Sequence, residues 1–218
     1  MKEEFLRPGL LCEGNSDERY LSHLIQKQLV DLLDRKSDRQ IRVLRCEVSD
    51  VPTTKPAKDV LAEARSLAVD CQVLFVHCDW DAEDKAHDYV MELRKWREGH
   101  KRCAEPVALV PVLMTESWML ADHAALGEAV PGLDLSGYPY GSPAQVEKRV
   151  SPAGKGGKGR KLGPKQVWQQ LLGKDAHSVL QDDADRLVEC TSLTELDKVP
   201  SYRAWRQATE KALTPRYL

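Results

Sequence analysis

Short apolar runs alternate with longer helix-patterned stretches over the first two-thirds of this chain, and that alternation limits the folds open to it. The run over 72–77 is apolar almost without interruption, which is typical of a parallel strand covered on both faces. The predicted strands span 8–12, 41–48, 72–77 and 107–114, and the predicted helices span 16–35, 57–69, 83–98 and a stretch that opens at Glu116. This order predicts an α/β fold with a four-stranded, mainly parallel, doubly wound sheet. Pro111 removes a ladder donor from the last run, so we expect that strand either to lie near an edge of the sheet or to be irregular.

The sequence changes character after residue 130. Residues 131–165 hold many Gly and Pro residues and show no regular period. Helical patterns return at 165–172, at about 176–189 and at 200–213. We therefore expect an α/β domain over 1–130, a Gly/Pro-rich basic connecting segment over 131–165, and a helical appendage over 166–218.

Bulk composition excludes several classes of protein. The net charge of −2 argues against a uniformly basic nucleic-acid coat, although one basic face is enough for binding. The six cysteines form no CxxC pair, so neither a zinc cage nor a disulfide framework is indicated. We find no signal peptide and no apolar run long enough to span a membrane, and we expect a cytoplasmic protein without a membrane partner.

Acidic residues follow three of the four predicted strands. Glu13 comes after the first, Asp79 and Asp81 after the third, and Glu116 after the fourth. All strands of an open parallel sheet point the same way, so their carboxyl ends share one edge, and ligands bind in the crevice there. In an extended segment, residues two apart project to the same side, which would let Asp79 and Asp81 hold Mg²⁺ together. The pattern predicts a site for one or two Mg²⁺ (or Mn²⁺) ions.

These motifs resemble those of the Toprim domain, the fold of topoisomerases, primases and OLD-type (overcoming-lysogenization-defect) nucleases. That family carries Glu-Gly after its first strand and Asp-x-Asp after its third, which here are Glu13-Gly14 and Asp79-Trp80-Asp81. The resemblance covers roughly residues 8–125. It implies a Toprim-like fold over this stretch and a Mg²⁺-dependent nuclease in which Glu13, Asp79 and Asp81 are catalytic.

A finer resemblance extends the predicted site. In OLD-type nucleases an acid shortly after the first glutamate and a later glutamate complete a two-metal site, and by motif position these correspond to Asp17 and Glu116. The resemblance thus implies metal ligands at Glu13, Asp17, Asp79, Asp81 and Glu116. The stretch MTESWMLAD is similar to a small stand-alone Toprim family whose members often neighbour ATPase genes in phage-defence loci. An ATPase partner and an antiviral role follow as expectations.

Ordinary structural roles remain open for the same acids. Glu13 also fits a surface turn, and Asp79 and Asp81 fit the cap of the next helix. Asp17 and Glu116 each fall in the first turn of a predicted helix, where an acid favours the helix dipole. Asp122 is predicted to be a solvated helix acid.

Positive charge concentrates in the connecting segment. Within 145–165, seven Lys or Arg residues accompany a single acid, Glu147. The segment is not a Walker P-loop, because Arg160 follows Gly159 and no strand precedes it. It fits either a solvated flexible loop or a clamp on nucleic-acid phosphates, and the clamp would use Lys155, Lys158, Arg160, Lys161 and Lys165. Because OLD-type nucleases use a lysine, the resemblance also implies that Lys161 or Lys165 stabilises transition-state charge.

Three functions compete at this stage. The first is a metal-dependent phosphodiesterase that acts on nucleic acid, with DNA favoured over RNA. The second is a Toprim ribonuclease for structured RNA, and the third is a non-catalytic Toprim subunit that regulates a partner ATPase. A haloacid-type phosphatase is disfavoured, because such enzymes place the Asp-x-Asp pair on the first strand and carry Thr or Val where this chain has Glu83.

Overall fold

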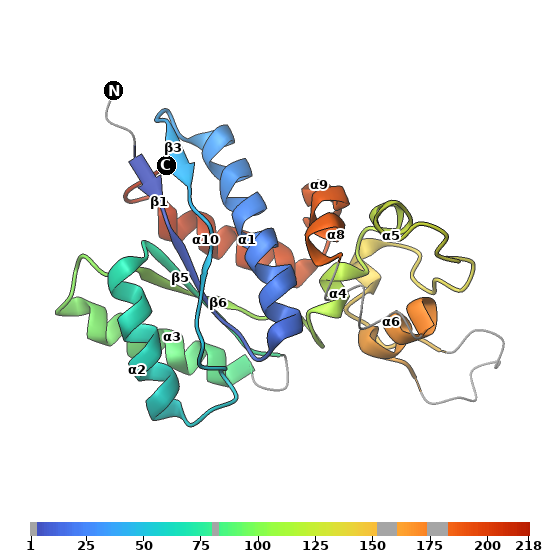
Figure 1. Cartoon of the computed structure of the whole chain (residues 1–218), viewed down its shortest axis with the longest axis horizontal. Helices are drawn as coiled ribbons and strands as arrows, with labels where there is room; N and C mark the ends of the chain where they lie inside the picture. The colour runs from blue at the N-terminus through green and yellow to red at the C-terminus, as the bar shows by residue number, and fades with distance from the viewer. Residues whose placement is uncertain (1–3, 80–82, 152–160, 174–182) are drawn as a thin grey trace. The chain divides into compact units, whose positions relative to one another are not determined.

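A four-stranded parallel sheet forms the centre of the fold (Figure 1). The computed structural model describes residues 4–79, 83–151, 161–173 and 183–218. The strands lie in the order β4-β2-β5-β6, with bounds β2 Pro8–Leu11, β4 Glu47–Val48, β5 Val73–His77 and β6 Glu105–Leu109. Every ladder in it is parallel, which confirms the predicted α/β class with a parallel sheet.

The predicted strand over 41–48 is in fact two short strands. β3 (Ile41–Val43) pairs with β1 (Glu4–Leu6) in a separate two-stranded parallel sheet, and β4 pairs with β2. Glu4 lies opposite Ile41 and Gly9 lies opposite Glu47, so the offset grows from 37 (41 − 4) to 38 (47 − 9). One extra residue therefore lies between the two pairings, and it breaks the ladder as a bulge does.

The fourth strand starts and ends earlier than predicted. β6 ends at Leu109, so Pro111 lies beyond it, but the strand is at the sheet edge, as the proline indicated. Its own proline, Pro106, lies inside the strand opposite Leu74. An edge strand tolerates this, because one side of its ladder needs no donor.

Helices pack against both faces of the sheet. α1 (Asn15–Lys36), α2 (Ala57–Asp70) and α3 (Glu83–Glu98) match the predicted helical periods. Leu74 and Val76 of β5 join a buried cluster with α2 and α3. Phe75 points to the opposite face, where its ring meets that of Trp205 with centroids 5.7 Å apart. All five residues of β5 are buried, as expected for a strand covered on both sides.

Two compact units divide the chain. Met1–Cys78, Ala82–Val110 and Ala204–Leu218 make up the first unit, and Asp79–Asp81 with Pro111–Arg203 make up the second. The chain passes between the two units at residues 79–81, after Val110 and after Arg203. Residues 204–218 belong with the sheet because Trp205, Leu213 and Tyr217 are buried.

Short helices and loops make up the second unit. Its described elements are α4 (Glu116–Met119), α5 (His123–Ala129), the 3-10 helix η2 (Pro143–Gln145), α6 (Pro164–Leu172), α8 (Ala184–Cys190) and α9 (Leu193–Leu196). α10 (Pro200–Leu213) begins in this unit and ends in the first. No helix among the described residues is both long and apolar enough to cross a membrane.

Candidate functional site

The candidate site starts from the pairing of β2 with β5. Leu11, the last residue of β2, lies opposite Val76 in a parallel ladder, so the two strands end at the same edge of the sheet. Glu13 follows β2 by two residues, and Asp79 follows β5 by two residues. Both acids are partly exposed. The register thus brings the two sequence motifs to neighbouring strand ends.

Thr53 forms hydrogen bonds to both of these strand ends. Its backbone N–H donates to the carbonyl of Cys12 (2.9 Å), and its hydroxyl donates to the carbonyl of His77 (3.0 Å). Thr53 is fully buried, and the Lys85 ammonium donates to its carbonyl oxygen. The loop before α2 and the first turn of α3 therefore both meet at the carboxyl edge.

Asp17 lies beside a buried histidine. His77 closes β5 as a strand residue, as the sequence predicted, and its Nδ1 lies 3.1 Å from the Leu109 carbonyl oxygen. A carbonyl oxygen only accepts, so Nδ1 carries a proton. Nε2 faces Asp17, with 3.7 Å between Nε2 and Oδ1. The histidine is fully buried, and the Asp17 carboxylate beside it is 18% exposed.

The pKa of the Cys12 thiol is raised at this edge. Burial, followed by the charges of Asp17 and Glu18, raises the pKa of Cys12 to about 12. Glu13 also raises it, by a smaller amount. The cysteine is therefore a neutral core residue, and the smaller coulombic contributions to its pKa come from the carboxylates of Asp17, Glu18 and Glu13.

Gly14 has an extended backbone, with φ of −164°, so the turn after Glu13 does not require a glycine. A Cβ built on Gly14 would meet nothing within 4 Å, so the surface here is open. Gly14 rather than Asn15 is the residue that precedes α1.

The remaining predicted ligands are less closely tied to this edge. Glu116 is the first residue of α4 and is partly exposed, and it belongs with Asp79 to the second unit. Asp81 lies outside the described residues. Within the described ranges, no group of three or more His, Cys, Asp or Glu side chains is arranged to hold a metal ion. That search covers Glu13, Asp17 and Asp79 but not Asp81.

The predicted phosphate clamp falls partly outside the described residues. Lys155, Lys158 and Arg160 are not described, whereas Lys161 and Lys165 are exposed, the latter in the first turn of α6. Val150 and Leu162 pair as an antiparallel bridge, with N···O distances of 2.9 and 2.7 Å. The bridge brings together the two ends of the basic segment.

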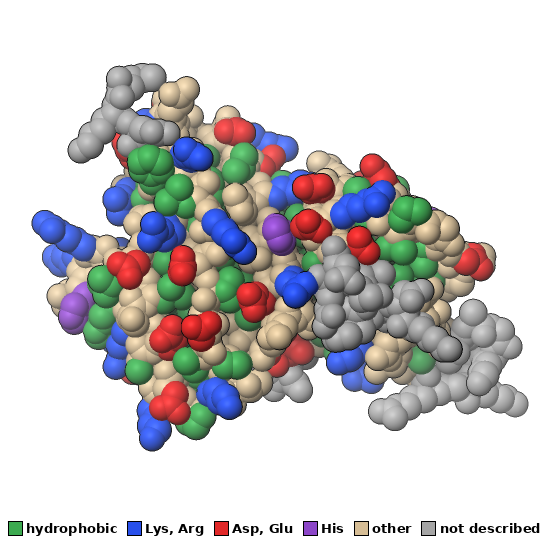
Figure 2. All heavy atoms as spheres, viewed as in Figure 1, with side chains coloured by type: hydrophobic (Ala, Val, Ile, Leu, Met, Phe, Trp, Pro, Cys, Tyr) green, Lys and Arg blue, Asp and Glu red, His purple; other side chains and the backbone are tan. Residues whose placement is uncertain are grey.

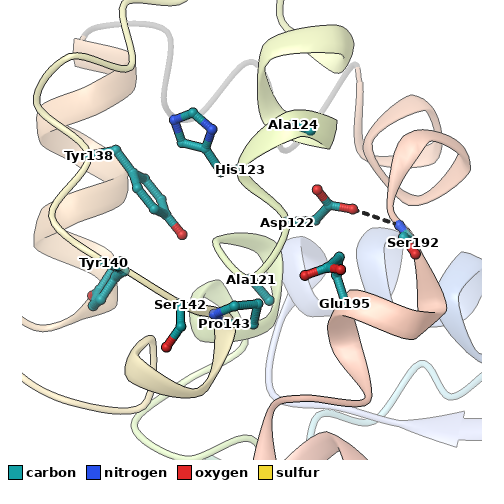
Figure 3. Close-up of a pocket in the computed structure, with 11 residues that line it drawn as sticks. Ala121, Asp122, His123, Ala124, Tyr138, Tyr140, Ser142, Pro143, Ser192 and Glu195 are labelled. Carbon is teal, nitrogen blue, oxygen red and sulfur yellow. Dashed lines mark hydrogen bonds between the residues drawn. The ribbon is translucent and has the colours of Figure 1, made fainter.

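A cavity of about 650 Å³ lies wholly within the second unit (Figure 3). Asp122 lines it, but its carboxylate accepts hydrogen bonds from Ala125 N (3.1 Å) and Ser192 N (2.8 Å). At 7% exposure it is a buried cap of α5, so the prediction of a solvated acid was wrong. The neighbouring Tyr138 hydroxyl donates to the Leu120 carbonyl oxygen, and burial raises its pKa. Its phenol is therefore a neutral hydrogen-bond donor.

Thr53, Lys85 and the contact between His77 and Asp17 were missed by sequence reasoning. Thr53 lies in a loop without a hydrophobic period, and nothing in its neighbours indicates that it bridges two strands. The position of Lys85, four residues after the Asp-x-Asp motif, was the available signal.

Comparisons of this chain with protein-family models, with curated proteins and with solved structures give no match.

Proposed function

We propose that this protein is a Mg²⁺-dependent phosphodiesterase of the Toprim type that cleaves nucleic acid, DNA in preference to RNA. The observation that carries the proposal is the parallel pairing of β2 with β5, because Glu13 and Asp79 follow these two strands at one edge. Asp17, Asp81 and Glu116 complete the proposed set, and an ATPase partner in antiviral defence remains part of the proposal.

The donor set at this edge fits a hard divalent cation. Every proposed ligand is a carboxylate, and Mg²⁺ prefers carboxylate oxygens while retaining several waters for a phosphate to replace. The raised pKa of Cys12, caused by burial and then by Asp17 and Glu18, agrees with a region of negative charge. When bound, the cation would supply Lewis-acid activation of the phosphate and of a water.

The side chains of the chain itself divide the remaining tasks. Glu13 acts as a ligand or as the general base that accepts a proton from water. His77 lies beside Asp17, with 3.7 Å between Nε2 and Oδ1. The open surface at Gly14 leaves room for a phosphate, since nothing lies within 4 Å of a Cβ built there. Thr53 keeps the two strand ends together through its bonds to Cys12 and His77.

Metal binding is the first test. Calorimetric titration of Mn²⁺ into the unmutated chain should give a binding signal that the Asp79→Ala/Asp81→Ala variant loses. The matched control is Asp59→Ala, which removes an exposed acid from the first turn of α2 and should bind Mn²⁺ like the unmutated chain. Equal binding by the double variant and the unmutated chain would refute the metal site.

Cleavage is the second test. Duplex DNA and structured RNA, each with Mg²⁺ or Mn²⁺, should be cut by the unmutated chain and by Asp59→Ala, with DNA cut faster. Glu13→Ala and Asp79→Ala should each abolish cleavage. Both variants should stay folded, because removing one of several like charges relieves repulsion. Preferred cleavage of RNA would instead support the ribonuclease. Cleavage that survives Glu13→Ala and Asp79→Ala together would rule out the proposed chemistry.

Metal binding without cleavage identifies the third function. If the chain binds Mn²⁺ but cuts neither substrate, adding the partner ATPase distinguishes activation from regulation. An altered ATPase rate without any cleavage would support the non-catalytic subunit.

A further inference from the structure

A second cavity, of about 630 Å³, lies in the first unit, at the opposite end of the sheet from the acids. Gln72, just before β5, and Glu105, the first residue of β6, line it, so it opens at the amino ends of these strands. β5 is five residues long, so about 16 Å of strand separates this cavity from the carboxyl edge. It is therefore a separate feature from the proposed metal site.

Positive charge dominates the wall of this cavity. Six cations from α3, the following loop and the C-terminal segment line it with one acid, Glu105; they are Arg94, Arg97, Lys101, Arg102, Lys211 and Arg216. The whole chain has 32 Lys and Arg against 34 Asp and Glu, and charges of both signs are interspersed on the face in Figure 2. The excess of cations is thus local to the cavity.

Glu105 neutralises only part of this charge. Its carboxylate lies 2.8 Å from Arg97 Nη1 and 3.5 Å from Arg94 Nε. Lys101, Arg102 and Lys211 are exposed and form no ion pair within the described part of the chain. Like charges held together in one concave site repel each other, and an anion relieves that repulsion.

Two of the arginines are held in place by the backbone. Arg94 Nη2 donates to the Pro106 carbonyl oxygen (3.3 Å), and Arg97 Nε donates to the Cys103 carbonyl oxygen (3.1 Å). A guanidinium fixed in this way loses less conformational entropy when it binds a ligand.

Tyr217 also lines the cavity. Tyr217 is 3% exposed, and among the described residues its hydroxyl has no hydrogen-bond partner. Burial raises the pKa of Tyr217, so the phenol stays neutral and can donate. A buried polar group without a bond costs free energy, so this hydroxyl is free to donate to a ligand that reaches it.

We propose that this cavity binds phosphate groups. Glu105 forms ion pairs with Arg94 and Arg97, which leaves the charges of Lys101, Arg102, Lys211 and Arg216 without an acid in the cavity wall. The ligand therefore carries two or more negative charges. Guanidinium groups recognise phosphate oxygens through paired N–H donors, which favours phosphate over a single carboxylate. The phosphates come either from a nucleic-acid backbone or from a free nucleotide. The inference goes beyond the proposed cleavage and does not depend on it.

Binding in EDTA tests the proposal without any metal-dependent reaction. A fluorescent single-stranded oligonucleotide and a fluorescent nucleoside triphosphate serve as the two probes, read by anisotropy with the full chain. Lys101→Glu/Arg102→Glu changes two exposed loop residues and should weaken one or both probes at least tenfold. Arg42→Glu/Arg45→Glu is the matched control, because it makes the same change in net charge at exposed residues elsewhere in the first unit and should bind like the unmutated chain.

A second variant and the salt dependence complete the test. Lys211→Gln, on α10, should also weaken binding, which guards against a local effect on the loop. The Lys101→Glu/Arg102→Glu variant loses two phosphate contacts. The plot of log K against log salt for the single strand should therefore become less steep, its negative slope shrinking in magnitude by about 1.4. Loss with the oligonucleotide points to a nucleic-acid backbone, and loss with the triphosphate alone points to a free nucleotide. If neither probe binds the unmutated chain, or if both double variants behave alike, the proposal is wrong.

Discussion

Replacing Asp122 by alanine should destabilise the second unit by removing two hydrogen bonds at once. One carboxylate oxygen caps α5 at Ala125 N (3.1 Å), and the other accepts from Ser192 N (2.8 Å), between α8 and α9. The dashed bond in Figure 3 is the second of these. The side chain thus ties two helical segments about 70 residues apart in the sequence, and it is only 7% exposed.

The size of the effect follows from the two bonds. Loss of a helix N-cap costs about 1 kcal/mol. Loss of a hydrogen bond to a charged, buried acceptor costs about 1.5–3 kcal/mol. Asp122→Ala should therefore lower the free energy of unfolding by about 2.5–4 kcal/mol. Asp122→Asn keeps one carbonyl acceptor for the cap but turns an N–H group toward Ser192 N, so it should lose about 1.5–3 kcal/mol.

Urea unfolding followed by tryptophan fluorescence measures these values, since Trp118 and Trp168 are buried in the second unit. Amide exchange at Ser192 should speed up in both variants. The control is Asp134→Ala, which removes a similar bond to Ser136 N (2.9 Å) from an exposed turn and should leave the unfolding midpoint nearly unchanged. A loss below about 1 kcal/mol for Asp122→Ala, or an equal loss for the control, would contradict the reasoning.

Two further predictions concern the core of the first unit. Gly9→Ala should lower the free energy of unfolding, measured in urea, by about 1–3 kcal/mol, because the new Cβ would lie 2.8 Å from Leu74 Cδ1 and 3.0 Å from Cys71 Sγ. Gly14→Ala is the control, because its Cβ would meet nothing within 4 Å, and it should change the free energy of unfolding by less than about 0.5 kcal/mol. Equal losses would show that packing is not the cause. Burial raises the pKa of Cys12 and Cys71 from 9.0 to about 12, so the unfolded chain loses these protons first as pH rises. The free energy of unfolding should therefore fall between pH 9 and 12, by up to about 1.4 kcal/mol per pH unit for each thiol, and a flat profile would refute this.

Much of the sheet could be predicted from hydrophobic patterns. The uninterrupted apolar run of β5 and the helical periods of α1, α2 and α3 depend on burial, which leaves a direct mark on the sequence. The division of 41–48 into two strands could not be predicted. It depends on a one-residue change of register against the N-terminal stretch.

The candidate site divides in the same way. The placement of Glu13 and Asp79 after adjacent parallel strands followed from motif order and topology. The role of Asp122 did not, because its partner Ser192 is distant in the sequence and donates through its backbone, which every residue type offers. The sequence indicated a basic segment at 145–165, but it gave no sign of the cavity lined by cations from α3 and α10.

The amino-acid sequence by itself determined the parallel α/β class and the order in which the acidic motifs follow the strands. Both are local properties, since periodicity and motif position need no knowledge of distant contacts. Tertiary structure alone decided that Thr53 joins two strand ends, that His77 faces Asp17, and that residues 204–218 return to the sheet. These features depend on hydrogen bonds and packing between segments far apart in the chain, and such contacts exist only once the backbone has folded.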